Sequence, residues 1–257
     1  YLYQNTRPNN TFNVRVRSDD TTVLFIIDKI LSSSTLTDKN FINCIDVGGY
    51  IGVVTLMMSK TLQNYKKNWK IHTFEPFEES FLRLQENVNL DPFKNNILLN
   101  KLAISDAPGT STLKIYQNTP GENHLEINDL HNTENISQQK TVKVITLRDY
   151  ILDNDINHVS ICKVDTEGED YNVIKGLKEY LKKKIIDYFV IEYQSINFSK
   201  IQNILHNHGY SIYFMVRNKN ILVSSLKNYP KNCRSLLNFI AVSQVKKNEF
   251  IKRFQIQ

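Results

Sequence analysis

The chain has 257 residues, of which 41% are hydrophobic and 23% are charged, proportions typical of a folded globular protein rather than a disordered one. Its length favours one α/β domain over residues 41–257, preceded by a short extension over residues 1–40. No apolar run approaches the roughly 18 residues needed to cross a bilayer, so we expect no transmembrane segment. Residue 1 is Tyr, and we expect a processed terminus or part of a longer, multidomain chain.

The charge balance is mildly basic, with 32 Lys and Arg against 26 Asp and Glu. Such a balance suits nucleic acid, a membrane surface or an anionic glycan. The basic residues are dispersed, however, and form no dense stripe with interleaved aromatic residues. We therefore expect no nucleic-acid partner.

The three cysteines, Cys44, Cys162 and Cys233, do not have the number or spacing of a disulfide framework or a zinc knuckle. Cys44 and Cys162 lie within apolar runs and are predicted to be buried thiols. Free thiols are typical of a reducing compartment, so we expect a cytoplasmic location.

Beyond the polar N-terminus, a helix is predicted at Val23–Leu31, and from residue 41 strands alternate with helices. This alternation predicts a doubly wound α/β fold. The predicted strands of the sheet are Phe41–Val47, Lys70–Glu75, Asn96–Leu102, Ser160–Val164, Asp187–Tyr193, Tyr210–Val216 and Asn238–Ser243. The predicted helices are Ile51–Leu62, Pro76–Leu90, Asp170–Lys182 and Ser199–Asn207. Because no helix separates the last two strands, we expect a seven-stranded, mostly parallel sheet with an antiparallel hairpin at one edge.

Two further strands are predicted at Ser111–Tyr116 and Thr141–Ile145. The segment between them, residues 117–140, is polar and lacks apolar periodicity. A loop of this length in a compact domain is usually a lid, a binding loop or a disordered segment. Both a role as a lid or acceptor loop and disorder stay open.

The strongest motif runs from Asp46 to Gly52 (DVGGYIG), after the first strand and at the start of the first helix. Glycines at such a turn let the backbone approach a ligand and expose the amides of the helix N-terminus. The spacing differs from the GxGxxG fingerprint, and the acid on the strand favours a ligand with a cationic amino-acid portion over a pyrophosphate. Asp46, Gly48, Gly49 and Gly52 are therefore candidate cofactor-binding residues.

Glu75 ends the second predicted strand, directly before Pro76. An acidic side chain at that place can accept hydrogen bonds from both ribose hydroxyls of a nucleoside. The alternative is a surface acid before a proline that starts a helix. Its separation from the glycine turn favours the ribose role.

The segment KVDTEGE, residues 163–169, lies at the carboxyl end of the predicted fourth strand, beside the switch point where doubly wound sheets bind ligands. Glu167 and Glu169 also favour the N-terminus of the following helix, which accounts for part of this acidity. Lys163 and Asp165 lie on the strand itself. A buried lysine must be paired, and Glu192 at the end of the next strand is predicted to be its partner.

Together these elements resemble the FkbM family of S-adenosylmethionine-dependent methyltransferases over Ile45–Glu192, and more weakly as far as Ser243. The most specific part is KVDTEGE followed by VIKG at 173–176, which looks like the family's K-x-D-x-E-G-x-E…vlkG signature. Residues 102–106 (LAISD) and 144–147 (VITL) also match the family pattern. The resemblance implies a class I methyltransferase fold, which is Rossmann-like with an antiparallel last strand.

The resemblance also implies S-adenosyl-L-methionine as the cofactor and S-adenosyl-L-homocysteine as its product. Asp46 and Gly48 would lie at the methionyl end, Glu75 would hold the ribose, and Ala103–Ile104 would lie along the adenine. Asp165 would face the methionyl amine or the acceptor. Family members methylate hydroxyls, often on sugars, so the implied acceptor is a glycan or a glycosylated small molecule.

Two positions depart from the family pattern. Tyr50 stands where the family usually has Asn, and Tyr cannot reproduce a short amide contact. After the fifth strand the family often has Glu followed closely by His, whereas this chain has Glu192, Tyr193 and Gln194. A histidine base at that place is therefore missing.

A sugar hydroxyl is a poor nucleophile, so methyl transfer to it needs a group that takes up the proton. Asp165, Glu192 and the loop residues His124 and His131 are the candidate bases, and Lys163 is a further candidate catalytic residue. The strand-end acids could also hold Mg²⁺ or Mn²⁺ through oxygen ligands, although we assign no metal site.

Two other functions stay open. A non-catalytic domain of a larger glycan-assembly protein would bind S-adenosylhomocysteine without turnover. A nucleotide-dependent oxidoreductase would share the architecture, but the missing GxGxxG and the acid-rich fourth strand disfavour it.

Overall fold

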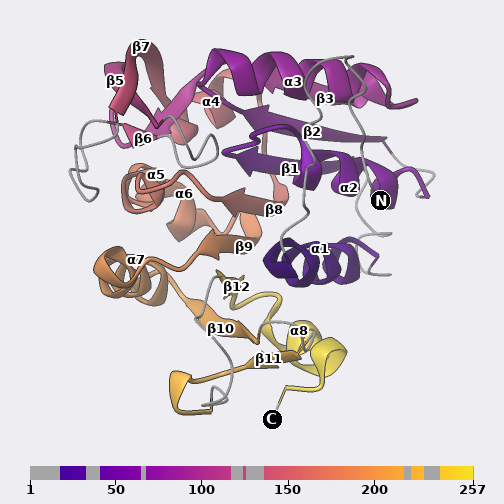
Figure 1. Ribbon diagram of the computed structural model, residues 1–257. Helices are drawn as coiled ribbons and strands as arrows, with labels where there is room; N and C mark the ends of the chain where they lie inside the picture. The colour runs from indigo at the N-terminus through magenta and orange to yellow at the C-terminus, as the bar shows by residue number, and fades with distance from the viewer. Residues whose placement is uncertain are drawn as a thin grey trace.

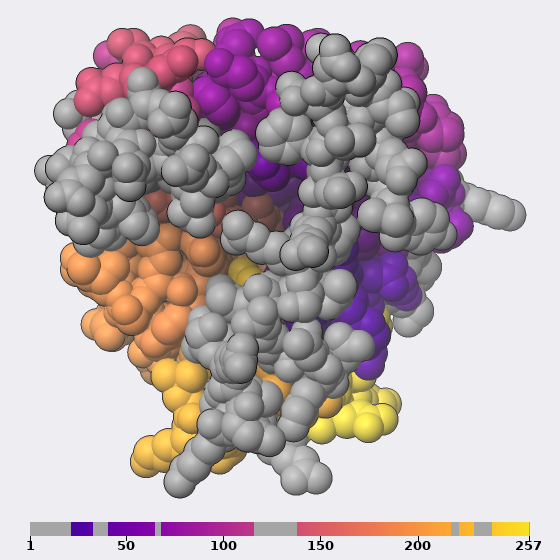
Figure 2. Space-filling view, in the orientation of Figure 1, coloured from indigo at the N-terminus to yellow at the C-terminus, as the bar shows by residue number. Residues whose placement is uncertain are grey.

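The computed structural model describes residues 18–32, 41–64, 68–116, 124–125, 136–216, 221–228 and 238–256. A large sheet carries helices on both faces, and a smaller sheet lies beside the carboxyl ends of its parallel strands (Figure 1). The space-filling view shows the first half of the chain, indigo to purple, at the top and right, and the C-terminal half, orange to yellow, at the lower left and bottom (Figure 2).

The large sheet has the strand order β11-β10-β12-β9-β8-β1-β2-β3. Neighbours from β3 through β9 are parallel, whereas β12 runs antiparallel to both β9 and β10. The predicted doubly wound, mostly parallel fold with an antiparallel last strand is confirmed. The strands are β1 Phe41–Val47, β2 Asn68–Phe74, β3 Ile97–Asn100, β8 Val159–Val164, β9 Ile186–Glu192, β10 Tyr210–Val216, β11 Ile221–Val223 and β12 Asn238–Ser243.

Two details of this sheet differ from the prediction. The short strand β11 pairs with β10 and brings the seven predicted strands to eight. Strand β12 pairs antiparallel with β10, as predicted, but it lies between β9 and β10 in the sheet. Local sequence patterns cannot show this insertion, because the partners of the last strand are chosen by contacts between distant parts of the chain.

Alternate residues of the strands enter two hydrophobic cores, because successive side chains point to opposite faces of a sheet. In β1, Ile42 and Cys44 belong to one core and Ile45 and Val47 to the other. The first core contains side chains of α1 (Ser18–Leu31), α2 (Val53–Leu62), α3 (Glu78–Asn89) and α8 (Lys247–Phe254). The second contains side chains of α4 (Leu147–Asp153), α5 (Asp170–Gly176), α6 (Lys178–Lys183) and α7 (Ser195–Asn207). Burial on both faces explains the continuous apolar runs of the central strands.

Several helices differ from the predicted ones. The helix predicted at residues 170–182 is divided into α5 and α6 at Leu177, and α7 starts four residues before its predicted start, at Ser195 rather than Ser199. Helices α4 and α8 were not predicted, because neither is long enough for apolar periodicity to stand out. Helix α4 instead begins with a local signal, since the Thr146 hydroxyl accepts a 3.0 Å hydrogen bond from the Asp149 amide.

The smaller sheet has the order β4-β7-β5-β6 and comprises β4 Ala103–Ser105, β5 Gly109–Tyr116, β6 His124–Leu125 and β7 Ile136–Thr146. Because β4 directly follows the carboxyl end of β3, this sheet is held at the edge where parallel strands present their ligand-binding loops. Of the predicted loop over 117–140, β6 and the start of β7 are described, and the rest lies outside the described residues.

The predicted burial of two thiols is confirmed, since Cys44 and Cys162 are free and fully buried. Cys233 lies outside the described residues. In the part of the chain that the structure covers, none of the helices has the length and apolar character required to cross a membrane.

Candidate functional site

The glycine turn joins the carboxyl ends of β1 and β2. The amides of Gly48 and Gly49 both donate to the carbonyl of Phe74, at 3.0 and 2.9 Å. Gly48 and Gly52 have φ angles of +82° and +94°, and Gly52 caps the N-terminus of α2. The predicted motif therefore forms a tight turn that opens a helix at the edge where ligands bind in this fold.

The glycine at position 48 is required by another part of the protein. A Cβ atom there would lie 1.8 Å from the carbonyl oxygen of Asp165, far inside any permitted contact. The interpretation that bare backbone at Gly48 serves ligand approach is thus incomplete. Because Gly48 has no side chain, the β1–α2 turn can pack directly on the turn that follows β8.

Tyr50 occupies the left-handed region with φ 48°, where Asn is much better tolerated than an aromatic residue. The usual Asn of the family pattern therefore suits the backbone conformation as well as any amide contact. Holding Tyr in this region costs about 1–2 kcal/mol. A 2.8 Å hydrogen bond from its amide to Glu75 Oε2 helps to hold the conformation.

Asp46 lies beneath the turn and is fully buried. Its Oδ2 accepts a 2.6 Å hydrogen bond from Thr55 Oγ1, and its Oδ1 lies 3.4 Å from Lys163 Nζ. Burial raises the pKa of Asp46, although Lys163 and Thr55 oppose the shift. In this arrangement Asp46 supports the turn from inside.

Glu75 directly follows β2 and is 8% exposed. Its two oxygens accept one backbone hydrogen bond each, from Tyr50 at 2.8 Å and from Phe77 at 2.9 Å. Burial raises the pKa of Glu75 to about 7, against the opposing effect of these two bonds. Because each carboxylate oxygen has two acceptor positions, two remain for the hydroxyls of a ligand.

Lys163 is 6% exposed and does not pair with Glu192, so the predicted pair is wrong. Its Nζ donates to the carbonyl of Gly48 at 2.7 Å and lies 3.4 Å from both Asp46 and Asp165. The reason is register: Lys163 lies opposite Asp46 in the β1–β8 pair and opposite Val190 in the β8–β9 pair, two residues before Glu192. Burial alone would lower the pKa of Lys163, but the two carboxylates outweigh it and raise the pKa.

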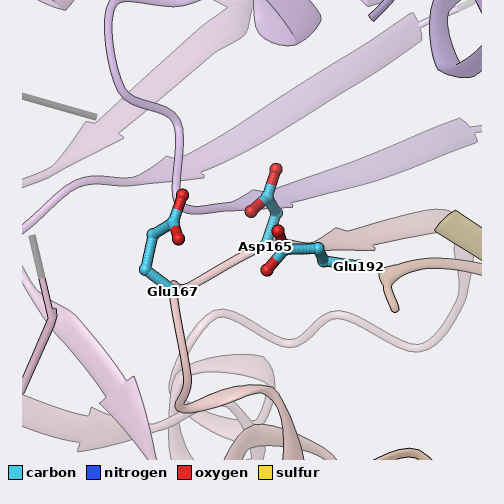
Figure 3. Close-up of side chains that lie close together, drawn as sticks. All are labelled: Asp165, Glu167 and Glu192. Carbon is cyan, nitrogen blue, oxygen red and sulfur yellow. The ribbon is translucent and has the colours of Figure 1, made fainter. Parts of the chain in front are cut away.

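Three carboxylates converge at the ends of β8 and β9. One oxygen from each of Asp165, Glu167 and Glu192 lies within 4.8 Å of the others, and the three side chains point into a common space (Figure 3). All three are partly exposed. This spacing would allow one divalent cation or several hydroxyl groups to be bound through oxygen atoms.

The pKa of Glu192 is raised far above its ordinary value. Burial, followed by the charges of Asp165 and Glu167, raises its pKa to about 9. The side chain of Gln194 donates to Glu192 Oε2 at 2.8 Å and opposes the shift. The raised pKa favours the protonated form of Glu192, and a positive charge bound nearby would oppose this shift.

Sequence reasoning assigned no site role to Glu167 or Asp170. Glu167 has φ 53°, and such backbone strain is typical of functional sites. Asp170 is almost fully buried and accepts from the amide and hydroxyl of Thr166, both at 3.0 Å. Burial, together with the charge of Asp165, raises its pKa to about 7. The sequence signal that could have identified Glu167 is the density of acidic residues in KVDTEGE. Part of this acidity was attributed to the N-terminus of the following helix, which favours acidic side chains.

Glu169 connects the acidic segment to the smaller sheet. It is 1% exposed and accepts hydrogen bonds from Ser105 Oγ at 2.7 Å and from Asn172 Nδ2 at 3.1 Å. Ser105 ends β4, two residues after Ala103. Glu169 thus fixes the position of β4 relative to the turn that carries Asp165.

The two residues predicted along the adenine face different cores. Ala103 packs with Phe77, which lies two residues after Glu75, and so belongs to the neighbourhood of the glycine turn. Ile104 is buried in the core under α4 to α7. The side chains of His124 and His131 lie outside the described residues, although the backbone of His124 pairs with Lys114 in β6.

A family model described as the methyltransferase FkbM domain matches residues 46–212. Methyltransferase 1 of Beauveria bassiana (strain ARSEF 2860) is 26% identical in an alignment of 202 residues that covers 72% of this chain and 78% of that protein. Because the family match covers well over half of the chain, it establishes the family independently of the fold.

Among solved structures, the methyltransferase FkbM of Methylobacillus flagellatus KT has a TM-score of 0.50 and 14% identity. That alignment covers 79% of this chain and 44% of the other, so this chain spans less than half of that protein. The METTL16 methyltransferase domain also has a TM-score of 0.50, with 9% identity over 88% of this chain and 68% of the other. At these identities the structures support the fold alone. The glycine turn, the acidic segment after β8 and the family match together show that the chain belongs to the FkbM methyltransferase family.

Proposed function

We propose that this methyltransferase uses S-adenosylmethionine to methylate a hydroxyl group, on a sugar of a glycan or of a glycosylated small molecule. The observation that carries the proposal is the arrangement of acids around one edge of the sheet. Glu75 lies beside the glycine turn, and Asp165, Glu167 and Glu192 converge at the carboxyl ends of β8 and β9.

The donor set suits this cofactor. Glu75 retains acceptor positions for two ribose hydroxyls, and the carboxylate of Asp165 can face an ammonium group. When bound, S-adenosylmethionine supplies a methyl group on a positively charged sulfonium, the electrophile of an in-line displacement. The remaining work of the protein is to align the acceptor hydroxyl, exclude water and receive a proton.

The acceptor proposal follows from the chemistry of the acidic cluster. Carboxylates accept hydrogen bonds from hydroxyl groups and repel phosphates, so this surface suits a polyhydroxylated acceptor better than a nucleic acid. The smaller sheet and the 117–140 segment would shape the acceptor side.

Glu192 is the proposed general base. In the isolated protein its pKa is about 9, because burial and neighbouring acids disfavour the charged form. A cationic ligand beside the cluster would favour ionisation, leaving a carboxylate with high affinity for the hydroxyl proton. Asp165 is the proposed partner of the methionyl amine.

The proposal is tested in two steps. Calorimetry should detect binding of S-adenosylhomocysteine and of S-adenosylmethionine, with no comparable heat from NADH. Incubation with methyl-labelled S-adenosylmethionine and a glycan panel should then give a product whose methyl group is located on an oxygen by mass spectrometry. A methyl group on nitrogen or carbon would exclude the O-directed reaction, and binding without turnover on any acceptor would favour a non-catalytic domain.

A further inference from the structure

The ammonium group of Lys163 is surrounded by acceptors from two different turns. Its Nζ donates to the Gly48 carbonyl at 2.7 Å and lies 3.4 Å from each of two carboxylate oxygens, Asp46 Oδ1 and Asp165 Oδ2. The lysine is only 6% exposed. A group held in this way is well placed to join backbone segments and poorly placed to exchange a proton with an incoming substrate.

The Gly48 carbonyl reaches Lys163 because of the unusual conformation of the turn. With φ +82°, Gly48 directs its amide to Phe74 of β2 and its carbonyl to Lys163 of β8. Two residues later, the amide of Tyr50 donates to Glu75. The turn is thus held on one side by a cation and on the other side by a carboxylate.

We propose that Lys163 is a positioning residue that fixes the glycine turn between β2 and β8 in the conformation needed to bind the cofactor. This inference rests on the proposed function and replaces the expectation that Lys163 takes part in the chemistry. Lys163 would act through Gly48 and Asp165, the two points at which the turns approach so closely that no Cβ fits between them.

A purely structural role must be separated from this positioning role. Asp46 Oδ1 is buried and has no hydrogen-bond partner among the described residues, so the nearby Lys163 ammonium compensates its charge. Removing Lys163 alone would therefore destabilise the fold through Asp46. In the double variant Asp46→Asn/Lys163→Met the buried charge is also removed, while an amide oxygen at position 46 can still accept from Thr55. The Gly48 carbonyl then loses its donor, and Asp165 loses the ammonium group that lies 3.4 Å from its Oδ2.

The experiment measures the melting temperature and S-adenosylhomocysteine affinity of wild type, Lys163→Met and the double variant. We expect the double variant to recover most of the melting temperature and still bind about 10- to 100-fold more weakly than wild type, the effect of losing a charged hydrogen bond. Hydrogen exchange in the peptide spanning residues 46–52 should be faster in the double variant. Lys175→Met, at an exposed lysine paired with Asp106, is the matched control and should match wild type in both measurements.

Asp46→Asn/Lys163→Gln provides a second comparison if the methionine variant does not fold. The glutamine amide can donate to the Gly48 carbonyl, so this variant should bind S-adenosylhomocysteine more tightly than the methionine double variant. If the methionine variant cannot be measured, the affinity of the glutamine variant should lie between that of wild type and a 100-fold loss. The inference would be overturned if Asp46→Asn/Lys163→Met recovered both the melting temperature and the S-adenosylhomocysteine affinity of wild type. Normal binding by Lys163→Met would overturn it as well. If wild type itself does not bind S-adenosylhomocysteine, the proposed function fails, and the inference fails with it.

Discussion

The carboxylate of Glu75 accepts a 2.8 Å hydrogen bond from the amide of Tyr50, so an acid at the end of β2 holds the glycine turn that follows β1. The same carboxylate also accepts from Phe77 at 2.9 Å, at the start of α3. Glu75 orders the turn and, in the proposed cofactor site, would also offer oxygen atoms to a ligand, and a substitution can separate these two functions.

The first prediction concerns these two functions. Glu75→Ala should weaken S-adenosylhomocysteine binding by roughly 1–3 kcal/mol, because charged hydrogen bonds are lost. Glu75→Gln keeps one acceptor oxygen for the backbone and should lose less. Calorimetry measures both, with Glu78→Gln at the exposed start of α3 as the control. Unchanged affinity in Glu75→Ala would remove Glu75 from the binding site.

The second prediction concerns Gly48. Because a Cβ atom would lie 1.8 Å from the Asp165 carbonyl, Gly48→Ala should force the two turns apart. We expect destabilisation of at least about 2 kcal/mol, in the range known for severe steric and backbone effects, together with loss of cofactor binding. Chemical denaturation measures the loss. Gly176→Ala, where the nearest contact would be 3.2 Å, should cost much less, and equal losses at both glycines would contradict the argument.

The third prediction separates the roles of Asp165 and Glu192. Asp165→Asn should weaken cofactor binding, whereas Glu192→Gln should retain binding and lower the turnover rate about 10²–10⁴-fold, the usual effect of losing a general base. Once an acceptor is available, calorimetry and initial rates distinguish the two effects. If neither variant slows turnover, the proton goes to His124, His131 or water. An inflection near pH 6.5 that is absent in His124→Ala would indicate the loop histidine.

The fourth prediction follows from the raised pKa of Glu192, which burial and nearby acids shift from 4.5 to about 9. Between these two pH values the unfolded chain has released the proton and the folded protein still holds it, so this residue makes stability fall as pH rises. Glu192→Gln cannot titrate and should lose less stability between pH 6 and 9. We expect a relative gain of on the order of 1 kcal/mol, or about 2–4 °C in melting temperature.

The control for this pH series is Glu179→Gln, which removes an exposed acid on α6. Its melting temperature should follow wild type across the same pH range. A Glu192→Gln curve parallel to wild type would show that the folded-state pKa of Glu192 is close to its ordinary value.

The fifth prediction concerns divalent ions at Asp165, Glu167 and Glu192, whose oxygens lie within 4.8 Å of one another. If these acids serve the cofactor amine, the acceptor and its proton as proposed, EDTA should leave both S-adenosylhomocysteine affinity and turnover unchanged. Loss of turnover on EDTA treatment, with recovery on adding Mn²⁺, would instead assign the cluster to metal-assisted activation of the hydroxyl. Electron paramagnetic resonance of added Mn²⁺ measures binding directly, and Glu167→Gln provides the comparison.

Most strands and helices of the main sheet, and the edge at which the candidate site residues meet, could be predicted from the sequence alone. Strands such as Phe41–Val47 carry their own signal, because burial on both faces demands a continuous apolar run. The glycine turn, Glu75 and KVDTEGE could be recognised for a related reason: each follows a strand, and the carboxyl ends of parallel strands meet at one edge. Local sequence was therefore enough to predict which segments would meet there.

The pairing of the side chains could not be predicted from local sequence. The register of β1 against β8 placed Lys163 beside Asp46 and away from Glu192, and the packing of two turns excluded a side chain at Gly48. Tertiary packing also brings Glu167 and Glu192 together from the ends of different strands. It places β12 between β9 and β10 in the sheet. These outcomes depend on register and on contacts between distant segments, whereas periodicity and spacing report only on a residue's own element and on the edge at which that element ends.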